Sequence, residues 1–178
     1  MKLCISILVS ACVLLALAGT AHAQFAPTGT GNVSVNIGAE ASIQIDTKDL
    51  TLTSVGTSFA DYTGTTAFTY KIRTGSGSGA GITLKVTTDF SGTGGPSVAS
   101  PPTAGDTLAY TCTLSSPGTA ATGTNATTTG DTSVGTFGAN VSSAKTGNSG
   151  SVSWALTNDP AYRAGSYTAV VTFTIHAV

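Results

Sequence analysis

Residues 32–46 read NVSVNIGAEASIQID, and every odd-numbered position is apolar while every even-numbered position is polar, charged or glycine. The apolar positions are Val33, Val35, Ile37, Ala39, Ala41, Ile43 and Ile45. Successive side chains of a β-strand point to opposite faces, so this pattern predicts extended chain with one buried face. Strands usually run about five or six residues. The alternation is longer than that, which predicts either two joined strands or one segment that pairs elsewhere.

The first 23 residues have the features of a secretory signal peptide. Lys2 precedes an apolar stretch that ends in the A-x-A cleavage site Ala21-His22-Ala23. A lipobox-like sequence ending at Cys12 is the alternative, but cleavage there would leave the apolar residues 13–17 at the new N-terminus. We therefore expect a signal peptide over residues 1–23, a flexible lead-in over 24–31 and one domain over 32–178. The expected route is through the periplasm to the cell surface or the medium.

The charge composition excludes some classes of partner. Charged residues make up only 8% of the chain, and without Lys2 there are six Lys and Arg against eight Asp and Glu. A chain with no basic excess is not expected to bind nucleic acid. No later run is long and apolar enough for a membrane span, so none is expected in the mature chain. Nearly neutral copies repel one another weakly, which favours association.

Cysteine usage leaves one thiol in the expected mature chain. Cys4 and Cys12 lie in the signal peptide, so Cys112 has no partner for an internal disulfide. Its strand parity matches that of Tyr110 and Leu114, which predicts a small buried core residue. A disulfide between two chains is the alternative.

Further strands follow from the same period-two alternation. We expect a short strand at Leu50 and Leu52, then strands over 66–73, 81–90, 107–114, 132–142, 149–157 and 167–178. The runs 66–73 and 81–90, joined by a glycine-rich connection, predict a hairpin. Residues 115–131 are expected to be a loop, either an ordered excursion or a flexible surface segment. The chain is therefore expected to be all-β, an antiparallel sandwich of about eight or nine strands, with a barrel as the alternative.

The last predicted strand has a clear core face. Its inward residues are expected to be Tyr167, Ala169, Val171, Phe173 and Ile175, and the strand is expected to continue to the final residue. His176 falls on the opposite, solvent-facing side.

The residues that carry most enzyme chemistry are sparse in this chain. His176 is the one histidine outside the signal peptide, and the pair Asp46 and Asp49 has Lys48 between its members. Metal and acid–base sites need several convergent partners, and no G-x-S-x-G elbow occurs. We therefore expect no catalytic, cofactor or metal site, and a protein that is not an enzyme. A turn with side-chain capping is expected at Asp46.

Aromatic residues support a second hypothesis, a self-contained secreted module that binds carbohydrate or another adhesion target. The candidates for a sugar platform are Tyr62, Tyr110, Tyr162, Tyr167 and Trp154. Several of them share parity with expected core positions, which favours a packing role for those residues.

The two ends of the chain resemble secreted pilus subunits of the chaperone-usher type, and especially the spore coat U family. The C-terminal sequence AGSYTAVVTFTIHAV has the Gly-x-Tyr turn, at Gly165 and Tyr167, followed by an alternating strand. Near the N-terminus, an alternating segment precedes a strand with Leu50 and Leu52, as in that family. The chain differs in having no cysteine in its first strand. The resemblance implies a single immunoglobulin-like, pilin-like sandwich and a structural subunit of a fimbria, pilus or spore-coat-like layer.

The resemblance also implies donor-strand complementation, in which a neighbour's N-terminal segment completes an unfinished sandwich. Val33, Val35 and Ile37 would be the donor side chains, with Ala39 sharing the role, and Ala41, Ile43 and Ile45 would belong to the chain's own first strand. The implied partners are copies of the chain or related subunits, a periplasmic chaperone and an usher. The alternative is that residues 33–45 pair within their own chain, as two strands hinged at Gly38.

Overall fold

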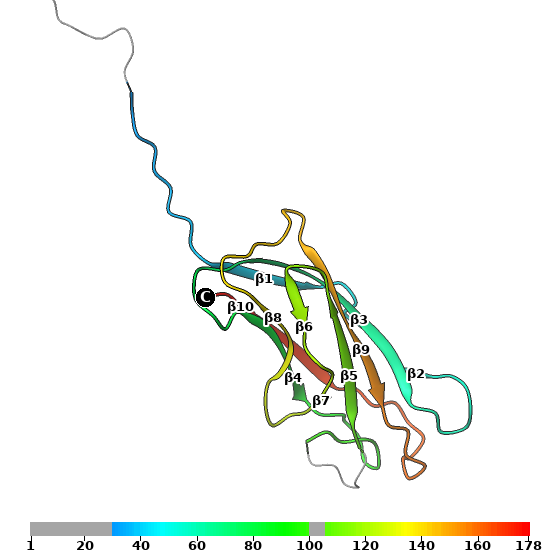
Figure 1. Cartoon of the computed structure of the whole chain (residues 1–178). Helices are drawn as coiled ribbons and strands as arrows, with labels where there is room; N and C mark the ends of the chain where they lie inside the picture. Colours follow the sequence, from blue (N-terminus) through cyan, green and yellow to red (C-terminus); the bar gives the residue numbers. More distant parts are fainter. Residues whose placement is uncertain (1–29, 100–105) are drawn as a thin grey trace, which may run out of the picture. The chain divides into compact units, whose positions relative to one another are not determined.

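The strands of the molecule follow the alternation of apolar residues along the chain. The structure is a computed structural model that describes residues 30–99 and 106–178, so the predicted signal peptide and most of the lead-in lie outside the described residues. Ten strands and no helix occur in these two ranges (Figure 1). They are β1 (Glu40–Ile45), β2 (Thr53–Ser54), β3 (Tyr62–Arg73), β4 (Gly81–Thr88), β5 (Leu108–Leu114), β6 (Gly118–Ala120), β7 (Asn125–Ala126), β8 (Thr132–Phe137), β9 (Asn148–Leu156) and β10 (Val170–His176).

The strands form two antiparallel sheets. The larger sheet has the order β1-β3-β9-β5-β7, with β2 also paired to β3, and the smaller sheet has the order β10-β4-β8-β6. The predicted all-β, antiparallel fold is confirmed, and the two-sheet arrangement is consistent with a sandwich.

The inward faces of both sheets contribute to one hydrophobic core. Phe68, Tyr70 and Ile72 of β3 are buried, as are Ile82, Leu84 and Val86 of β4. The rings of Tyr70 and Phe137 lie 5.2 Å apart between centroids and join β3 to β8. The Tyr110 hydroxyl of β5 donates a hydrogen bond to the Ser133 carbonyl of β8 at 2.9 Å. These contacts cross from one sheet to the other, so the sheets are held together by packing and by buried, satisfied polar groups.

The predicted hairpin between residues 66–73 and 81–90 is wrong. β3 pairs with β1, β2 and β9, whereas β4 pairs with β10 and β8, so consecutive strands lie in different sheets. The connection over residues 74–80 is long enough to cross the roughly 10 Å between stacked sheets. Because the chain crosses here, the apolar faces of β3 and β4 lie on opposite sides of one core.

The segment 115–131, which was expected to be a loop, contains two short strands. β6 pairs with β8, and β7 pairs with β5. A side chain at Gly123 would place its Cβ 2.2 Å from the Tyr110 carbonyl oxygen, so glycine permits this close approach of two backbones. These strands were missed because they are two or three residues long and lack an apolar alternation.

Several predicted boundaries also differ from the structure. Leu50 and Leu52 precede β2 and are half-buried against the core, although they are not in a strand. The C-terminal strand begins at Val170 and ends at His176. Beyond this strand, the carbonyl of Val178 accepts a hydrogen bond from the Gly75 N–H at 2.6 Å.

Candidate functional site at the open edges of two sheets

β1 and β10 are the edge strands on the same side of the two sheets. In the described part of the chain, β1 pairs with β3 alone and β10 with β4 alone, so each has one side free of ladder hydrogen bonds. The two strands contact each other. Glu40 pairs with Arg73 at the end of β3, and His176 pairs with Gly81 at the start of β4. The short connection 74–80 joins these points, so β1 and β10 run in opposite directions.

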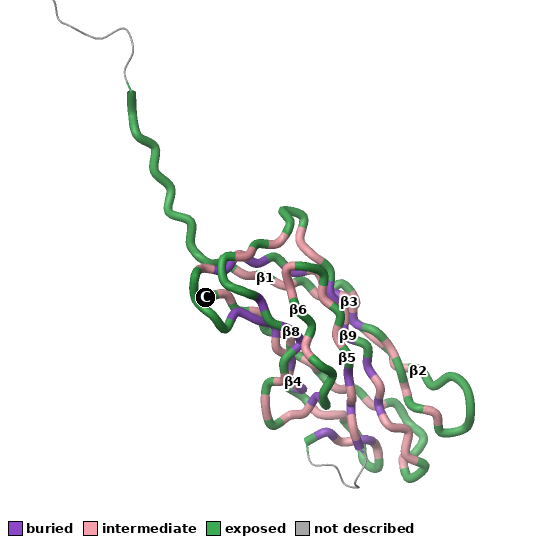
Figure 2. The backbone as a smooth tube through the Cα atoms, viewed as in Figure 1, coloured by how far each residue is buried: buried purple, intermediate pink, exposed green. Residues whose placement is uncertain are grey.

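The inward side chains of the two edge strands are only partly covered. Ala41, Ile43 and Ile45 of β1 are half-buried, and so are Val171, Phe173 and Ile175 of β10. The corresponding positions of β3 and β4 are buried, as the change from pink to purple shows (Figure 2). Apolar surface therefore stays partly open along both edges, although the rest of the core is closed. We call the inward side chains of β1 and β10 and the space between these strands the edge groove.

A cavity of about 760 Å³ opens at the end of the edge groove near Ile45. Its apolar walls come from residues such as Ile45, Leu50, Leu52, Val171 and Phe173. Trp154 lies at its buried side and donates its indole N–H to the Thr66 hydroxyl at 2.9 Å. Because the polar group of Trp154 is already satisfied, its ring presents apolar surface to this space.

The tyrosines at the rim of the cavity are held by hydrogen bonds. Tyr162 donates its hydroxyl proton to Oδ1 of the buried Asp106 at 2.5 Å. Burial, followed by this bond to a carboxylate, raises the pKa of Tyr162 well above its ordinary value. The Tyr167 hydroxyl donates to the Arg163 carbonyl at 2.7 Å. Neither hydroxyl is free to donate a hydrogen bond to a ligand, because each already donates to an acceptor within the protein.

Asp89 organises the loop after β4. Its carboxylate accepts hydrogen bonds from Ser97 Oγ at 2.6 Å and from the backbone N–H groups of Phe90, Val98 and Ala99. Burial alone would raise the pKa of Asp89, but these four hydrogen bonds outweigh it and lower the pKa. The loop that carries Phe90 and Pro96 to the cavity is therefore fixed by one ionised side chain.

The alternating segment before β1 exposes its apolar residues. Val33 is 100% exposed, Val35 80% and Ile37 61%, and residues 30–40 are exposed throughout (Figure 2). Residues 30–36 do not belong to the compact unit formed by Ile37–Val178. Three branched aliphatic side chains with one parity are thus left in water.

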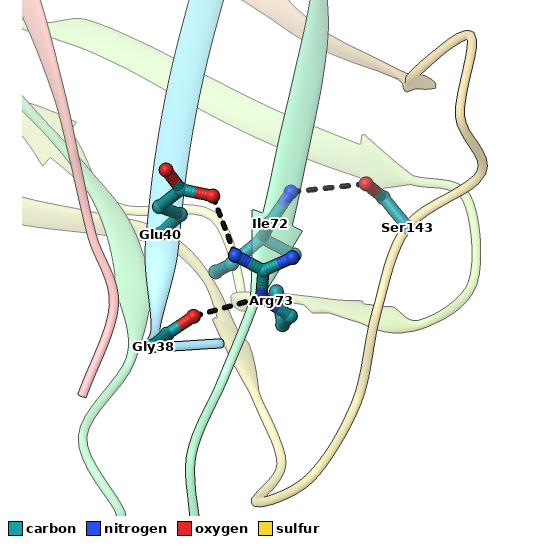
Figure 3. A network of polar contacts seen from close by, with 5 residues as sticks. All are labelled: Gly38, Glu40, Ile72, Arg73 and Ser143. Atoms are coloured by element: carbon teal, nitrogen blue, oxygen red, sulfur yellow. Dashed lines mark hydrogen bonds and ion pairs between the residues drawn. The ribbon is translucent and has the colours of Figure 1, made fainter. Parts of the chain in front are cut away.

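Arg73 marks the point where β1 begins. Its Nε donates to the Gly38 carbonyl at 2.7 Å, and its guanidinium forms an ion pair with Glu40 at 2.6 Å (Figure 3). The backbone of Ile72 receives and donates hydrogen bonds with Ser143 on the other side of β3. One fork-shaped side chain therefore binds two alternate residues of the chain that enters β1.

The residues predicted for the donor segment, the first strand and the core face of the C-terminal strand differ in exposure and in strand membership. Val33, Val35, Ile37 and Ala39 precede β1 and are exposed, whereas Ala41, Ile43 and Ile45 lie in β1. Val171, Phe173 and Ile175 lie on the inward side of β10.

Tyr167 and Ala169 precede β10, although the alternation places them in the same strand. Tyr167 packs over Gly92 and Gly95, where a Cβ on Gly95 would lie 2.2 Å from the tyrosine ring. The carbonyl of Thr168 accepts a hydrogen bond from Ser91. These contacts draw the chain out of the ladder with β4.

The other candidate residues make contacts within the protein or are half-buried. His176 is exposed and its Nε2 contacts the Gly79 carbonyl. Asp46 accepts hydrogen bonds from Gln44 and from the Thr69 hydroxyl, the latter at 3.0 Å. No group of three or more His, Cys, Asp or Glu that could hold a metal ion occurs within residues 30–99 and 106–178. Burial raises the pKa of the half-buried Cys112 to about 11.

Sequence reasoning did not identify two parts of this site. The cavity walls at Leu50, Leu52 and Trp154 come from two segments far apart in the chain, and nothing local indicates that they meet. The ion pair between Arg73 and Glu40 depends on the register between β1 and β3. Its only sequence signal is that opposite charges lie on the outward faces of two predicted strands.

Searches of the chain against family models, curated proteins and solved structures gave no match. Among the residues that the structure describes, no helix has the length and apolar character needed to cross a membrane. The features that bear on function are therefore the edge groove, the cavity and the exposed segment before β1.

Proposed function

We propose that this protein is a non-enzymatic structural subunit of a surface fibre or coat, which assembles by β-strand complementation. In this proposal the two sheets form an immunoglobulin-like, pilin-like sandwich that lacks one strand between β1 and β10. Residues 33–37 of a neighbouring copy, with Ala39 at their end, supply that strand. The proposal is in keeping with the resemblance of the chain ends to the spore coat U family of chaperone-usher subunits.

One observation carries this proposal: the chain has apolar side chains of one parity exposed, and an apolar edge that is left partly open. Val33 and Val35 are largely exposed in the one copy described, while Ile43 and Phe173 are only half-buried. Exposed contiguous apolar surface in a soluble protein commonly marks an interaction site. A strand placed in the edge groove would cover both surfaces at once.

The free edges also favour a strand as the occupant. Because β1 and β10 contact each other, an extended segment has to part them by the width of one strand; it can then bond to both strands through its backbone, with its odd-numbered side chains pointing into the core. Since β1 and β10 run in opposite directions, a neighbour's segment can lie antiparallel to β10. The same segment then lies parallel to β1, so it makes one antiparallel and one parallel pairing.

The energies are compatible with assembly that depends on the backbone as well as on side chains. Burying three branched aliphatic side chains contributes roughly 5 to 9 kcal/mol. Ordering the segment costs about 1 to 2 kcal/mol per residue, which is of similar size. The hydrogen bonds along two free edges therefore supply the net stabilisation, each about 0.5 to 1.5 kcal/mol.

The proposal carries consequences for partners and location. The subunit is exported through the periplasm to the cell surface or the medium. A chaperone covers its open edge before assembly, and an usher accepts the subunit. Its partners are copies of itself or related subunits, and it needs no cofactor.

The test changes one donor residue and its immediate neighbour. Val35→Asp places a charge among the donor side chains, whereas Ser34→Asp places the same charge on the opposite face of the segment. We expect the parent chain and Ser34→Asp to form multimers, and Val35→Asp to remain monomeric, in size-exclusion chromatography and electron microscopy of the exported protein. Equal multimer formation by the parent and Val35→Asp would contradict strand complementation.

A peptide provides a complementary test. A chain that lacks residues 24–38 keeps the edge groove but has no donor, so a synthetic peptide of residues 30–39 should bind it and raise its melting temperature. The same peptide with aspartate at position 35 should give no shift. A shift of equal size with both peptides would indicate binding outside the edge groove.

A second function is favoured by the composition of the cavity. Tyr62, Tyr162 and Tyr167 line it together with Asn158 and Arg163, a mixture of aromatic and polar groups suited to a carbohydrate. In that case the protein is a self-contained binding module. A glycan array probed with monomeric Val35→Asp distinguishes the two functions, because a module binds without assembly.

A further inference from the structure

The edge groove is open to the chain's own residues 33–37 as well as to a neighbour's. Since these residues are covalently joined to β1, they would enter their own groove by folding back alongside β1. Side chains directly opposite each other in an antiparallel pair share one face. The apolar residues reach the core only if odd-numbered positions lie opposite odd-numbered positions of β1.

Parity restricts the turn that such a fold-back can use. A two-residue turn at Gly38 and Ala39 would pair Ile37 with Glu40, and every apolar donor side chain would then face solvent. A three-residue turn at 38–40 instead pairs Ile37 with Ala41 and Val35 with Ile43, which directs the donor side chains inward. Insertion of residues 33–37 into the groove of their own chain, or self-insertion, therefore requires two changes. Glu40 must leave the β1 ladder, and Gly38 must change its backbone direction.

Arg73 binds these same two residues. Its Nε donates to the Gly38 carbonyl at 2.7 Å and its terminal nitrogen pairs with Glu40 at 2.6 Å (Figure 3). Glu40 also lies directly opposite Arg73 in the β1–β3 register. A three-residue turn would break all of these contacts.

The support behind Arg73 comes from the opposite side of β3. Arg73 forms a backbone bridge with Ser142, and the neighbouring Thr74 donates its N–H to the Val141 carbonyl at 2.9 Å. The Thr74 hydroxyl donates to the Gly138 carbonyl at 2.8 Å. The strand end that carries Arg73 is thus held by hydrogen bonds, so its fork can keep Gly38 and Glu40 in place.

We propose that Arg73 is a positioning residue that disfavours self-insertion, by holding Gly38 and Glu40 in the geometry of the β1 entry, and thereby leaves residues 33–37 for a second copy of this chain. This inference rests on the proposed function. It adds that residues 33–37 insert into another copy in preference to their own chain. The ion pair is exposed, with 42% and 78% of the two side chains accessible, so its effect is a bias between two states and not a lock.

A disulfide reporter measures fold-back directly. In a three-residue turn Asn36 and Ser42 lie opposite each other on the solvent face, so the pair Asn36→Cys and Ser42→Cys can form a disulfide within one chain only in the folded-back state. The reporter is placed in a Cys112→Ser background, expressed with its leader and purified as the exported protein. Intramolecular and intermolecular disulfides are separated by mobility on a non-reducing gel.

Arg73→Ala in this reporter should raise the intramolecular fraction about five- to tenfold. Lys85→Ala, which removes a charge from β4 in the other sheet, should leave the fraction unchanged. Arg73→Lys retains the charge but not the fork, and should give an intermediate value. The double variant Glu40→Arg with Arg73→Glu restores an ion pair and should lower the fraction again.

The outcomes separate this inference from the proposed function. If the parent reporter forms multimers and Arg73→Ala does not change the intramolecular fraction, Arg73 has no such role although strand complementation stands. If the parent chain forms no multimers, the proposed function fails whatever the effect of Arg73→Ala on the intramolecular disulfide. Circular dichroism of each variant guards against loss of the fold, which is not expected for an exposed side chain.

Discussion

The rings of Phe68 on β3 and Phe173 on β10 lie 5.8 Å apart between centroids and are tilted by 44°. Phe68 belongs to the larger sheet and is buried, whereas Phe173 belongs to the edge strand of the smaller sheet and is half-buried. This pair connects the two sheets directly beneath the edge groove. It forms part of the surface that a complementing strand would cover.

Phe173→Ala should destabilise the monomer by about 1.5 to 2.5 kcal/mol, roughly half the cost for a fully buried phenylalanine, because part of this ring is already in water. The loss should be larger in the assembled form, where a donor strand covers the ring. Urea unfolding of monomer and assembly measures both values. An equal loss in the two forms would show that Phe173 does not face the donor.

Gly150 is expected to resist substitution because its neighbours leave no room for a side chain. An added Cβ would lie 2.4 Å from two ring atoms of Phe68 and 2.7 Å from Leu114. Gly150→Ala should therefore cost about 1 to 3 kcal/mol of unfolding free energy through overpacking. Gly138→Ala is the matched control, since its Cβ would meet Val141 at an ordinary 3.8 Å. Similar losses for the two variants would contradict the packing described.

Asp89 should make stability depend on acid pH. Its pKa is lower in the folded state than the ordinary value of 3.8, so its stabilising effect is present above that value and is lost as pH falls through the lowered pKa. Asp89→Asn should reduce the urea midpoint at pH 6, and the difference from the parent should shrink towards pH 2.5. Asp61→Asn, at an exposed position outside this hydrogen-bond set, is the control for the substitution itself. A difference that stays constant down to pH 2.5 would rule out this linkage.

Cys112 should be a poorly reactive thiol in the folded protein. Burial raises its pKa to about 11. At pH 8 the thiolate fraction should therefore be about one in a thousand. Alkylation by iodoacetamide should be much slower in the native protein than in urea, and its rate should rise steeply between pH 8 and pH 10. Equal native and unfolded rates would place Cys112 in solvent.

Much of the fold could be predicted from the alternation alone. In β3 the alternation puts the even-numbered Phe68, Tyr70 and Ile72 on one face, and all three are buried. The same reasoning located β4, β5 and β9 within a few residues of their ends. Alternation is a local property, because the pleat of one strand determines which side chains share a face.

Strand pairing could not be predicted in the same way. β3 and β4 are consecutive and amphipathic, which favoured a hairpin, but they lie in different sheets. Which strands pair in one sheet depends on which apolar faces bury each other across the core. Those contacts involve segments far apart in the chain. For the candidate site, alternation indicated the inward residues of β1 and β10, whereas the cavity walls and the Arg73 contacts depend on the assembled sheets.

The alternation of residues 33–45 is enough to assign this stretch one apolar face. It did not determine where along this run pairing begins, because Val35 and Ile43 have the same local pattern. Tertiary pairing sets that point: β3 pairs with β1 as far as Arg73, and two residues later the Gly75 N–H donates to the Val178 carbonyl instead. No partner strand then continues beside Gly38 in the described chain. The apolar residues before Gly38 are left exposed because the ladder that covers their neighbours ends there.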